Sequence, residues 1–358
     1  MNQPTARAGQ AWMVRVDEPV LVTGANGFIG SRVVNSLLDY GFRHIRSFVR
    51  PFSDLTALET ATRAHGGTSN RAIEVVEGNL LSREDCARAA SGVSLIFHLA
   101  AGMDKSFAGC FMNSVLTTRN LLDEGRASGL LKRFVNVSSF AVYSNFLMPR
   151  GACLDESAPI ESEPVQRQDA YAYAKLKQEL LVQQYGNAHG IPHVILRPGA
   201  VFGPGKAPLT GRVGISPFGP FLHMGGGNEL PLTYVDNCAD AIALAGVVSG
   251  IDGQVFNIVD DDLPTSRSFL RLYKRHARSM RSIPVPYRVA YLLCSLWESY
   301  SVRSAGQLPP RFNRRRCAAE WKGNTYSNRK LKQLTGWMPR VPIEQAALRY
   351  FEYVRSQR

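Results

Sequence analysis

The chain has 358 residues, of which 45% are hydrophobic and 20% are charged, and its formal net charge is +13. This composition is ordinary for a globular protein of one large or two coupled domains, and neither internal repeats nor low-complexity tracts interrupt it. The six cysteines are scattered without the spacing of a zinc site, so we expect reduced thiols and no metal. No signal peptide is recognised, and we expect a cytoplasmic protein.

Residues 1–18 are polar and are expected to form a flexible tail. After this tail, apolar β runs alternate with helical periodicity. A strand, a glycine-rich turn and a helix occupy 19–41, further strands are expected at 44–50, 73–80, 94–101, 133–139 and 192–198, and helices at about 111–128 and 169–189. This alternation predicts an α/β fold with a doubly wound parallel sheet of the Rossmann type, which binds ligands at the carboxyl ends of its strands.

The alternation stops near residue 200. Residues 201–232 are rich in Gly and Pro and are expected to form a long irregular loop, followed by a helix near 235–249 and a strand at 254–259. The apolar stretch 285–302 contains Arg288 and Glu298 and is too short to span a bilayer. We expect a buried helix there; a lid over a lipophilic substrate and a membrane-facing helix are the alternatives.

Basic residues are densest at 311–317, which read RFNRRRC. No zinc-finger, RRM or KH signature accompanies them, so we expect a solvated face that attracts anionic ligands such as phosphates, with no nucleic-acid partner. His98 ends a predicted strand and is interpreted as structural. Asp260, Asp261 and Asp262 are interpreted as a solvated loop with a helix start, and a cation site is the alternative.

The turn TGANGFIG (23–30) spaces Gly24, Gly27 and Gly30 three residues apart. It follows the first strand and opens the first helix, where glycines let the backbone approach a pyrophosphate held at the helix amino terminus. The turn therefore predicts dinucleotide binding, and a tight βα turn without a ligand is the alternative.

The end of the second predicted strand bears on the choice of dinucleotide. Arg50 follows this strand directly, and no acidic residue lies at its end to bind a ribose 2′-hydroxyl. We expect NADP, with NAD as the alternative. Asn79, after the third strand, is expected to contact the adenine edge.

The stretch DAYAYAKLKQE (169–179) contains two overlapping Tyr-x-x-x-Lys pairs, Tyr171 with Lys175 and Tyr173 with Lys177. Residues four apart share a helix face. Two residues along a helix correspond to a rotation of about 200°, so the two pairs face nearly opposite directions. One pair at most can serve a single site.

Several motifs occur together in order along the chain. They are TGANGFIG (23–30), GNL (78–80), HLAA (98–101), NSVLTTRNLL (113–122), VNVSSFAVYS (135–144), YAYAK (171–175), LRPGAVFGPG (196–205), TYVDNCADAIALA (233–245) and FNIVDD (256–261). With these motifs the chain resembles the extended short-chain dehydrogenase/reductase family, also called the NAD-dependent epimerase/dehydratase family, over roughly residues 19–345.

The resemblance implies catalytic roles for four residues. Tyr171 would be the acid/base, while Lys175 would bind the nicotinamide ribose and lower the pKa of Tyr171. Ser139 would orient the substrate oxygen, with Ser138 as the second choice, and Asn113 would support a proton relay. The family frame Tyr-x-x-x-Lys-x-x-x-Glu fits Glu179, which favours the first Tyr–Lys pair; the second pair is then a bystander.

The resemblance also implies which residues bind the cofactor and how the chain is divided. Cofactor contacts are expected from Gly24, Asn26, Gly27, Phe28, Ile29, Gly30, Arg50, Asn79, Leu80, Leu99, Ala100, Ala101, Ser138, Lys175 and Pro198. Residues 19–200 would form the dinucleotide-binding Rossmann domain, and 201–358 mainly a smaller C-terminal substrate-binding subdomain, with 233–260 returning to the Rossmann core. A homodimer is expected.

Departures from the family pattern narrow the reaction. The strand-five segment SSFAVYS lacks the acidic pair of sugar 4,6-dehydratases, and Ala200 stands where nucleotide-sugar epimerases usually have Asn. The chain is more similar to the hydroxysteroid dehydrogenase and flavanone/aldehyde reductase branches. We expect an NAD(P)-dependent oxidoreductase acting on a small-molecule secondary alcohol or ketone. A nucleotide-sugar epimerase, with Arg212 or residues 311–316 holding the diphosphate, and a non-catalytic NADP sensor are the alternatives.

Overall fold

A computed structural model describes residues 11–65, 72–104, 106–206, 209–216, 219–304 and 307–357. Its centre is a seven-stranded sheet in which each strand pairing is parallel. In spatial order the strands are β12 (Val255–Ile258), β7 (His193–Pro198), β5 (Arg133–Val137), β4 (Leu95–His98), β1 (Val20–Thr23), β2 (Ile45–Val49) and β3 (Ile73–Glu77). The predicted doubly wound fold is confirmed.

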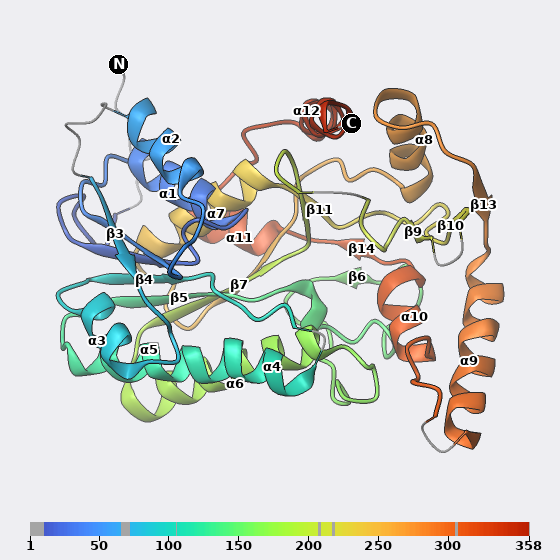
Figure 1. Ribbon diagram of the computed structural model, residues 1–358, viewed down its shortest axis with the longest axis horizontal. Helices are drawn as coiled ribbons and strands as arrows, with labels where there is room; N and C mark the ends of the chain where they lie inside the picture. Colours follow the sequence, from blue (N-terminus) through green and yellow to red (C-terminus); the bar gives the residue numbers. More distant parts are fainter. Residues whose placement is uncertain are drawn as a thin grey trace.

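Helices cover both faces of this sheet (Figure 1). One layer contains α1 (Gly30–Asp39), α2 (Thr56–Ala64), α7 (Val235–Val247) and α11 (Arg329–Thr335). The other contains α3 (Arg83–Ala90), α4 (Phe107–Phe111), the π-helix η2 (Met112–Leu116), α5 (Thr117–Ala127) and α6 (Ala170–His189). Alternate residues of β1 face the two layers: Val20 and Val22 pack with α1, and Leu21 packs with α5.

The segment 201–232 is more ordered than the predicted irregular loop. It contains β9 (Gly214–Ile215) and β10 (Phe221–His223), which form a small sheet with β13 (Ser282–Pro284). At its two ends β8 (Ala200–Phe202) pairs with β11 (Leu232–Tyr234). The β8–β11 and β10–β13 pairings join residues distant in sequence, so the Gly- and Pro-rich composition gave no local signal for them.

The remaining elements lie outside the large sheet. They are η3 (Phe140–Val142), β6 (Cys153–Leu154) paired with β14 (Thr325–Tyr326), α8 (Ser266–His276), α9 (Tyr287–Arg303), α10 (Arg314–Trp321) and α12 (Ile343–Ser356). Helix α9 corrects the expectation of a buried helix at 285–302, because its buried residues are Ala290, Cys294 and Ser301 and its large apolar residues are exposed. No helix among the described residues is long and apolar enough to cross a membrane.

Residues 11–18 correct part of the expected flexible tail 1–18, because they are anchored to the core; residues 1–10 lie outside the described part. Within 11–18, Trp12 stacks on Phe42 with ring centroids 6.1 Å apart, and Val14 is buried. The Met13 amide donates to the Val247 carbonyl. Apolar side chains in a polar stretch therefore anchor this segment to the core.

Asp260 corrects the expectation of a solvated acidic loop. Its carboxylate is buried and accepts hydrogen bonds from Thr233 Oγ1 (3.2 Å), the Tyr234 amide (2.9 Å) and Asn237 Nδ2 (3.0 Å). The carboxylate thus ties β11 and α7 to the end of β12. Among the described residues, no group of three or more His, Cys, Asp or Glu is placed to hold a metal ion.

Candidate active site at the carboxyl ends of the strands

The glycine-rich turn joins β1 to α1 without room for side chains. Gly24 has φ +67°, a conformation that favours glycine. A Cβ on Gly30 would lie 2.0 Å from the Gly24 carbonyl oxygen, which no side chain can do without opening the turn. The first helix therefore begins directly behind the turn with its amide groups facing the end of β1, as a pyrophosphate requires.

A cavity of about 640 Å³ begins at this turn and extends along the carboxyl ends of β1, β4, β5 and β7. Of the predicted site residues, the cavity is lined by Gly24, Gly27, Phe28, Ile29, Gly30, Leu99, Ala101, Ser138, Ser139, Tyr171, Lys175 and Pro198. The fold thus brings together residues that are spread over 175 positions of sequence, as the rule for parallel sheets predicts.

Lys175 is buried on α6, and its ammonium group donates to the Val137 carbonyl oxygen (2.7 Å) and to Gln178 Oε1 (2.9 Å). Gln178 Nε2 in turn donates to Thr118 Oγ1 (2.7 Å). An ammonium group has three protons, so one remains for a ligand in the cavity. Burial lowers the pKa of Lys175 to about 8, and the carboxylate of Glu179 partly opposes this shift.

Tyr171 lies one turn before Lys175, and its phenol shares the cavity with the Ser139 side chain. Burial raises the pKa of Tyr171 to about 12, while the Ser139 hydroxyl lowers it by a smaller amount. The lowering of this pKa that the resemblance attributed to Lys175 is not found in the polypeptide alone, where burial is the largest influence. At neutral pH the phenol is therefore protonated.

The second Tyr–Lys pair lies on a different face of α6. The ring of Tyr173 packs against Phe107 and Phe111, with centroids 5.4 Å and 6.4 Å apart, and Lys177 Nζ lies 5.9 Å from the same ring. Neither Tyr173 nor Lys177 lines the cavity. The rotation of about 200° between the pairs separates them as the helix geometry requires.

Ser138 offers a polar group without a partner. Its side chain is 3% exposed, and Oγ has no hydrogen-bond partner among the described residues although the residue lines the cavity. Buried hydroxyl groups are normally hydrogen-bonded, so an orphaned one beside a cavity favours a polar ligand there. The close glycine turn, the spare proton of Lys175 and this hydroxyl together fit a dinucleotide.

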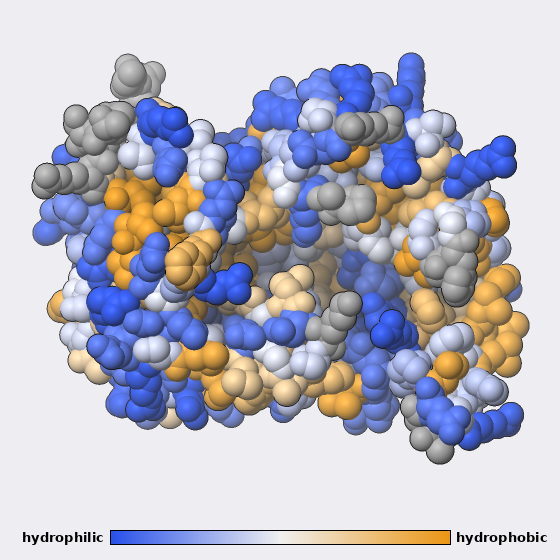
Figure 2. Space-filling model, in the orientation of Figure 1, coloured by the Kyte–Doolittle hydropathy of each residue, from blue (hydrophilic) through white to orange (hydrophobic). Residues whose placement is uncertain are grey.

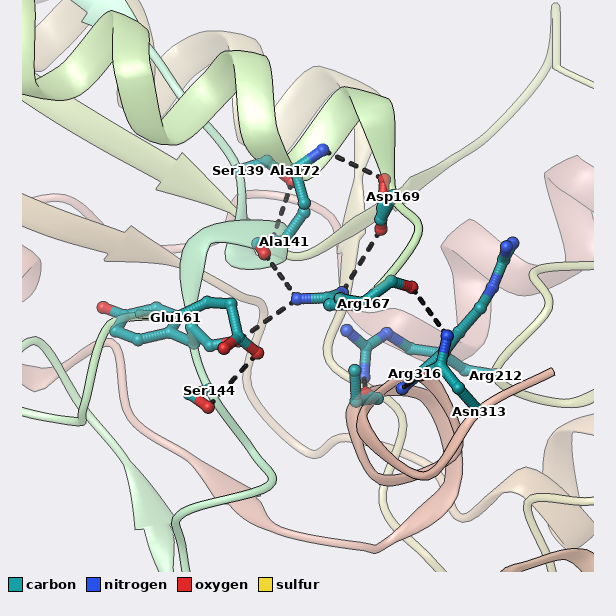
Figure 3. Close-up of polar contacts among 12 residues, drawn as sticks. Ser139, Ala141, Ser144, Glu161, Arg167, Asp169, Ala172, Arg212, Asn313 and Arg316 are labelled. Carbon is teal, nitrogen blue, oxygen red and sulfur yellow. Dashed lines mark hydrogen bonds and ion pairs between the residues drawn. The ribbon is translucent and has the colours of Figure 1, made fainter. Parts of the chain in front are cut away.

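Arg167 connects the segment that carries Ser139 and Ala141 to Asp169 at the start of α6 (Figure 3). Its buried guanidinium donates to the Ala141 carbonyl oxygen (2.7 Å) and forms an ion pair with Asp169 (3.4 Å). Asp169 caps α6 by accepting from the Ala172 amide (3.0 Å). Arg167 thus holds the loop after β5 against the start of the helix; burial lowers its pKa, and its Nε has no partner among the described residues.

Six predicted site residues do not line the cavity: Asn26, Arg50, Asn79, Leu80, Ala100 and Asn113. Asn79 uses its side-chain oxygen to accept from the Leu81 amide (3.0 Å). Asn113 lies in the π-helix, is exposed and donates to Asp104 Oδ2 (3.0 Å), and its role in a proton relay stays a prediction. The Arg50 side chain is exposed after β2.

The cavity is also lined by residues that sequence reasoning missed. They are Met103, Val201, Phe202, Lys206, Leu209, Thr210, Leu232, Phe269 and Tyr350. Lys206 had a possible signal, since it follows the Gly-Pro-Gly of residues 203–205, and its ammonium group lies 5.5 Å from the Phe28 ring of the glycine turn. No local sequence signal marked Phe269 or Tyr350, because only the packing of α8 and α12 brings these residues to Phe202 of β8.

A second cavity of about 260 Å³ adjoins the first and shares Ser139 and Tyr171 with it. Arg167, Arg212 and Glu320 supply its charged groups, together with Asp169. Arg212 is held by a hydrogen bond from Nη1 to the Ala319 carbonyl oxygen (2.9 Å). A substrate that reaches Tyr171 from this side would meet two guanidinium groups and two carboxylates.

Comparisons with known proteins agree with this architecture. A mouse protein, sterol-4-alpha-carboxylate 3-dehydrogenase, decarboxylating, is 25% identical over 344 residues, which cover 92% of this chain and 88% of the mouse protein. A trifunctional UDP-glucose 4,6-dehydratase/UDP-4-keto-6-deoxy-D-glucose 3,5-epimerase/UDP-4-keto-L-rhamnose-reductase of Arabidopsis thaliana is 27% identical over 262 residues, or 67% of this chain but 36% of the plant protein. The chain therefore spans about a third of that relative's length.

A crystal structure of UDP-glucuronic acid 4-epimerase from Bacillus cereus in complex with NAD has the same fold. It matches with a TM-score of 0.68 at 21% identity, covering 95% of this chain and 99% of the epimerase. The parallel sheet and its helical layers therefore define a Rossmann-type fold, which the two proteins share.

Residues 20–258 match the model of the NAD dependent epimerase/dehydratase family, and the chain belongs to this family. The resemblance stated from the motifs is thus confirmed, as is the expectation that the protein is an enzyme.

Proposed function

We propose that the protein is an NAD(P)-dependent oxidoreductase that interconverts a secondary alcohol and a ketone, with Tyr171 as the acid/base. The observation that carries this proposal is that Tyr171, Ser139 and Lys175 line one cavity together with the glycine turn. A phenol, a hydroxyl and an ammonium group beside a dinucleotide-binding turn are the groups that proton transfer to a carbonyl oxygen needs.

The proposed roles follow from the donors and acceptors of these side chains. When bound, the cofactor supplies a nicotinamide ring that exchanges a hydride with the carbinol carbon of the substrate. In ketone reduction the protonated phenol of Tyr171 gives its proton to the substrate oxygen, and in alcohol oxidation the phenolate takes that proton back. Ser139 orients the same oxygen, and Lys175 holds the cofactor ribose with its remaining proton.

The raised pKa of Tyr171 favours the reductive direction in neutral solution. With a pKa of about 12 the phenol is almost fully protonated at pH 7, which is the form required to donate. Oxidation needs a positive charge beside the phenol, and we propose that Lys175 contributes this charge once the cofactor is in place.

The proposal is tested by a matched pair of tyrosine variants on one helix. Tyr171→Phe is expected to lower kcat by about 100-fold to 10,000-fold, because general acid–base catalysis contributes on that order, while the cofactor Kd stays within about twofold. Tyr173→Phe keeps the ring that packs on Phe107 and is expected to retain activity. Steady-state turnover with NADPH or NADH against a panel of ketones and aldehydes measures both; turnover in Tyr171→Phe equal to that of the wild type would refute the assignment.

For the cofactor we propose NADP, with NAD as the alternative. Arg50 directly follows β2, is exposed and has no ion-pair partner among the described residues, so it is available for a 2′-phosphate. Arg50→Ala is expected to weaken NADPH binding about tenfold, as loss of one charge-assisted hydrogen bond does, and to leave NADH binding unchanged. Equal effects on the two dinucleotides, measured by fluorescence titration, would contradict the preference.

A nucleotide-sugar epimerase is the second candidate. The observation that favours it is the position of Arg212 and Arg167 around the cavity that shares Tyr171, since guanidinium groups bind phosphates and carboxylates bidentately. Incubation with UDP-sugars separates the two functions, because an epimerase produces an isomer without net change in the cofactor. Stoichiometric oxidation of NADPH by a ketone would support the oxidoreductase.

We also propose an organisation and setting for the enzyme. Residues 201–358 would serve mainly as a substrate-binding subdomain and 19–200 as the dinucleotide domain, with 233–260 returning to the Rossmann core; the two walls of the cavity support this division. A homodimer in the cytoplasm is the proposed state; the six free cysteines support the cytoplasmic setting.

A further inference from the structure

Helix α9 presents its apolar stripe outward. The spacing i, i+3, i+4, i+7, i+8 and i+11 places Val289, Leu292, Leu293, Leu296, Trp297 and Tyr300 on one face of the helix, and these side chains are 36–63% exposed. Val302, at 76% exposed, and Ile283, at 50%, extend the apolar surface along α9 and the preceding strand. We call the six residues the α9 stripe.

The helix is held by its other face, so the orientation of the stripe is determined by packing. Ala290 and Cys294 are buried in a cluster with Met224, which directly follows β10, and with Cys317 and Trp321 of α10. Figure 1 places α9 at one end of the molecule beside α10. Figure 2 shows hydrophobic surface along the same edge. Contiguous exposed apolar surface of this kind marks an interaction site in most proteins.

The surroundings of the stripe are strongly basic. Residues 281–316 contain seven arginines and a single acidic residue, Glu298, which pairs with Arg314. Exposed arginines lie at both ends of the helix, Arg288 at the start and Arg303 at the end, and Arg311 and Arg316 follow on the adjoining segment. An amphipathic helix with Leu, Trp and Tyr on one face and arginines at its margins has the chemistry of a helix that lies in a membrane interface.

We propose that α9 docks the protein on an anionic lipid surface, with the α9 stripe in the headgroup–acyl boundary and the arginines on the lipid phosphates and carboxylates. Charge complementarity decides between this occupant and a second copy of the chain. Two copies paired through α9 would bring their basic segments 281–316 together, whereas an anionic bilayer neutralises them. The association is peripheral, in keeping with a helix held to the domain by Ala290 and Cys294.

Adjoining cavities lie between α9 and the candidate site. A cavity of about 320 Å³ reaches Cys294 of α9 and shares Gly211 and Glu320 with the cavity that contains Tyr171. A lipid-dissolved alcohol or ketone would approach Tyr171 from this end; this corollary rests on the proposed function, while docking itself does not.

Co-sedimentation with lipid vesicles tests the docking without any measurement of turnover. Vesicles of equal parts phosphatidylcholine and phosphatidylserine are compared with vesicles of phosphatidylcholine alone. The wild type is expected to sediment with the anionic vesicles, to bind the neutral ones at least about tenfold more weakly, and to dissociate as salt is raised. Failure of the wild type to sediment with the anionic vesicles would overturn the proposal.

Matched variants locate the contact. Leu296→Glu places a carboxylate in the α9 stripe and is expected to weaken binding at least about tenfold, and Tyr300→Ser is a milder second variant. Leu130→Glu is the control, because Leu130 is exposed to a similar extent, 57% against 59%, in the loop between α5 and β5. Unchanged binding by both stripe variants would overturn the proposal. So would a wild-type dimer in size-exclusion chromatography that Leu296→Glu converts to a monomer, because a second copy would then cover the stripe.

Discussion

Helices α1 and α9 have similarly spaced apolar residues. Those of α1 are buried in the core, whereas those of α9 are exposed. In α1, Val33, Val34 and Leu37 are fully buried against the sheet. In α9, Leu292 and Leu296 are more than half exposed, and smaller residues face the protein. The difference shows that periodicity determines where a helix forms, whereas the neighbouring elements determine which of its faces is covered.

The two regions also differ in how their charges are used. The Rossmann region buries an ion pair between Arg197 and Glu179, and the α9 region has an exposed pair between Arg314 and Glu298. A contact of the same chemical type should therefore contribute very differently to stability in the two regions. The predictions below test this contrast, beginning with the largest expected effect.

Arg197→Met is expected to lower the free energy of unfolding by about 3–5 kcal/mol, because it leaves the Glu179 carboxylate buried without its bidentate partner. Arg314→Met removes a surface ion pair and should lower the free energy of unfolding by less than about 1 kcal/mol. Urea unfolding followed by circular dichroism measures both variants. Equal losses in the free energy of unfolding would contradict the expected difference between the two ion pairs. If the double variant Arg197→Met/Glu179→Leu recovers stability, the isolated Glu179 charge is the cause of the loss.

Truncation of one leucine in each helix extends the comparison to apolar contacts. Leu37→Ala in α1 should lower the free energy of unfolding by about 2–5 kcal/mol, since it creates a cavity in the core. Leu296→Ala in α9 should change it by no more than about 0.5 kcal/mol in the absence of lipid. A large loss for Leu296→Ala in thermal or urea unfolding would mean that the α9 stripe is covered in solution.

A glycine substitution in the dinucleotide turn and one after β10 are expected to differ in their effect on cofactor binding. Gly30→Ala would place a Cβ 2.0 Å from the Gly24 oxygen, and the distorted turn should weaken dinucleotide binding about 100-fold, in line with backbone strain of about 1–3 kcal/mol. Gly227→Ala meets no atom within 4 Å and should bind as the wild type does. Titration of NADPH fluorescence is the measurement; wild-type affinity in Gly30→Ala would show that the turn does not hold the cofactor.

A further prediction is a pH dependence of stability from His98, whose effect is small near neutral pH and grows as the pH falls. The ring lies between Thr23 Oγ1 and Thr118 Oγ1, each at 2.8 Å, and burial lowers its pKa to about 3. The unfolded chain takes up a proton near pH 6.5 and the folded protein does not, so the free energy of unfolding falls as the pH drops from 6.5 toward 3. The slope from this group is about 1.4 kcal/mol per pH unit.

His98→Gln tests that slope, because glutamine retains a donor and an acceptor but does not titrate. The variant is expected to be less stable near pH 7 and to lose less stability than the wild type between pH 6 and pH 4. Parallel pH curves of unfolding for the two proteins would contradict a buried neutral histidine.

The Rossmann region was predictable because its signals are local. Each buried parallel strand is a continuous apolar run, and the sheet order follows from right-handed crossovers between them. Small strands such as β9 and β10 gave no such signal, since two or three residues carry no periodicity. Asp260 also escaped prediction, because its partners Thr233, Tyr234 and Asn237 precede it by more than twenty residues.

The residues of the candidate site likewise differ in whether the sequence alone could predict them. The glycine turn and the Tyr171–Lys175 pair have short, specific spacings, and both line the cavity. Arg167 could not be assigned a role from sequence, because its importance lies in contacts with the Ala141 carbonyl and Asp169. Asn113 matched a motif, but the π-helix and the hydrogen bond to Asp104 place its side chain outside the cavity.

By itself the sequence determined the parallel sheet, the dinucleotide turn and the family, since these depend on apolar runs, glycine spacing and residues close together along the chain. The tertiary structure alone decided which walls close the cavity, that burial raises the pKa of Tyr171, and that α9 turns its leucines outward. These properties depend on which distant segments pack together, and packing removes water from some side chains while leaving others exposed to it.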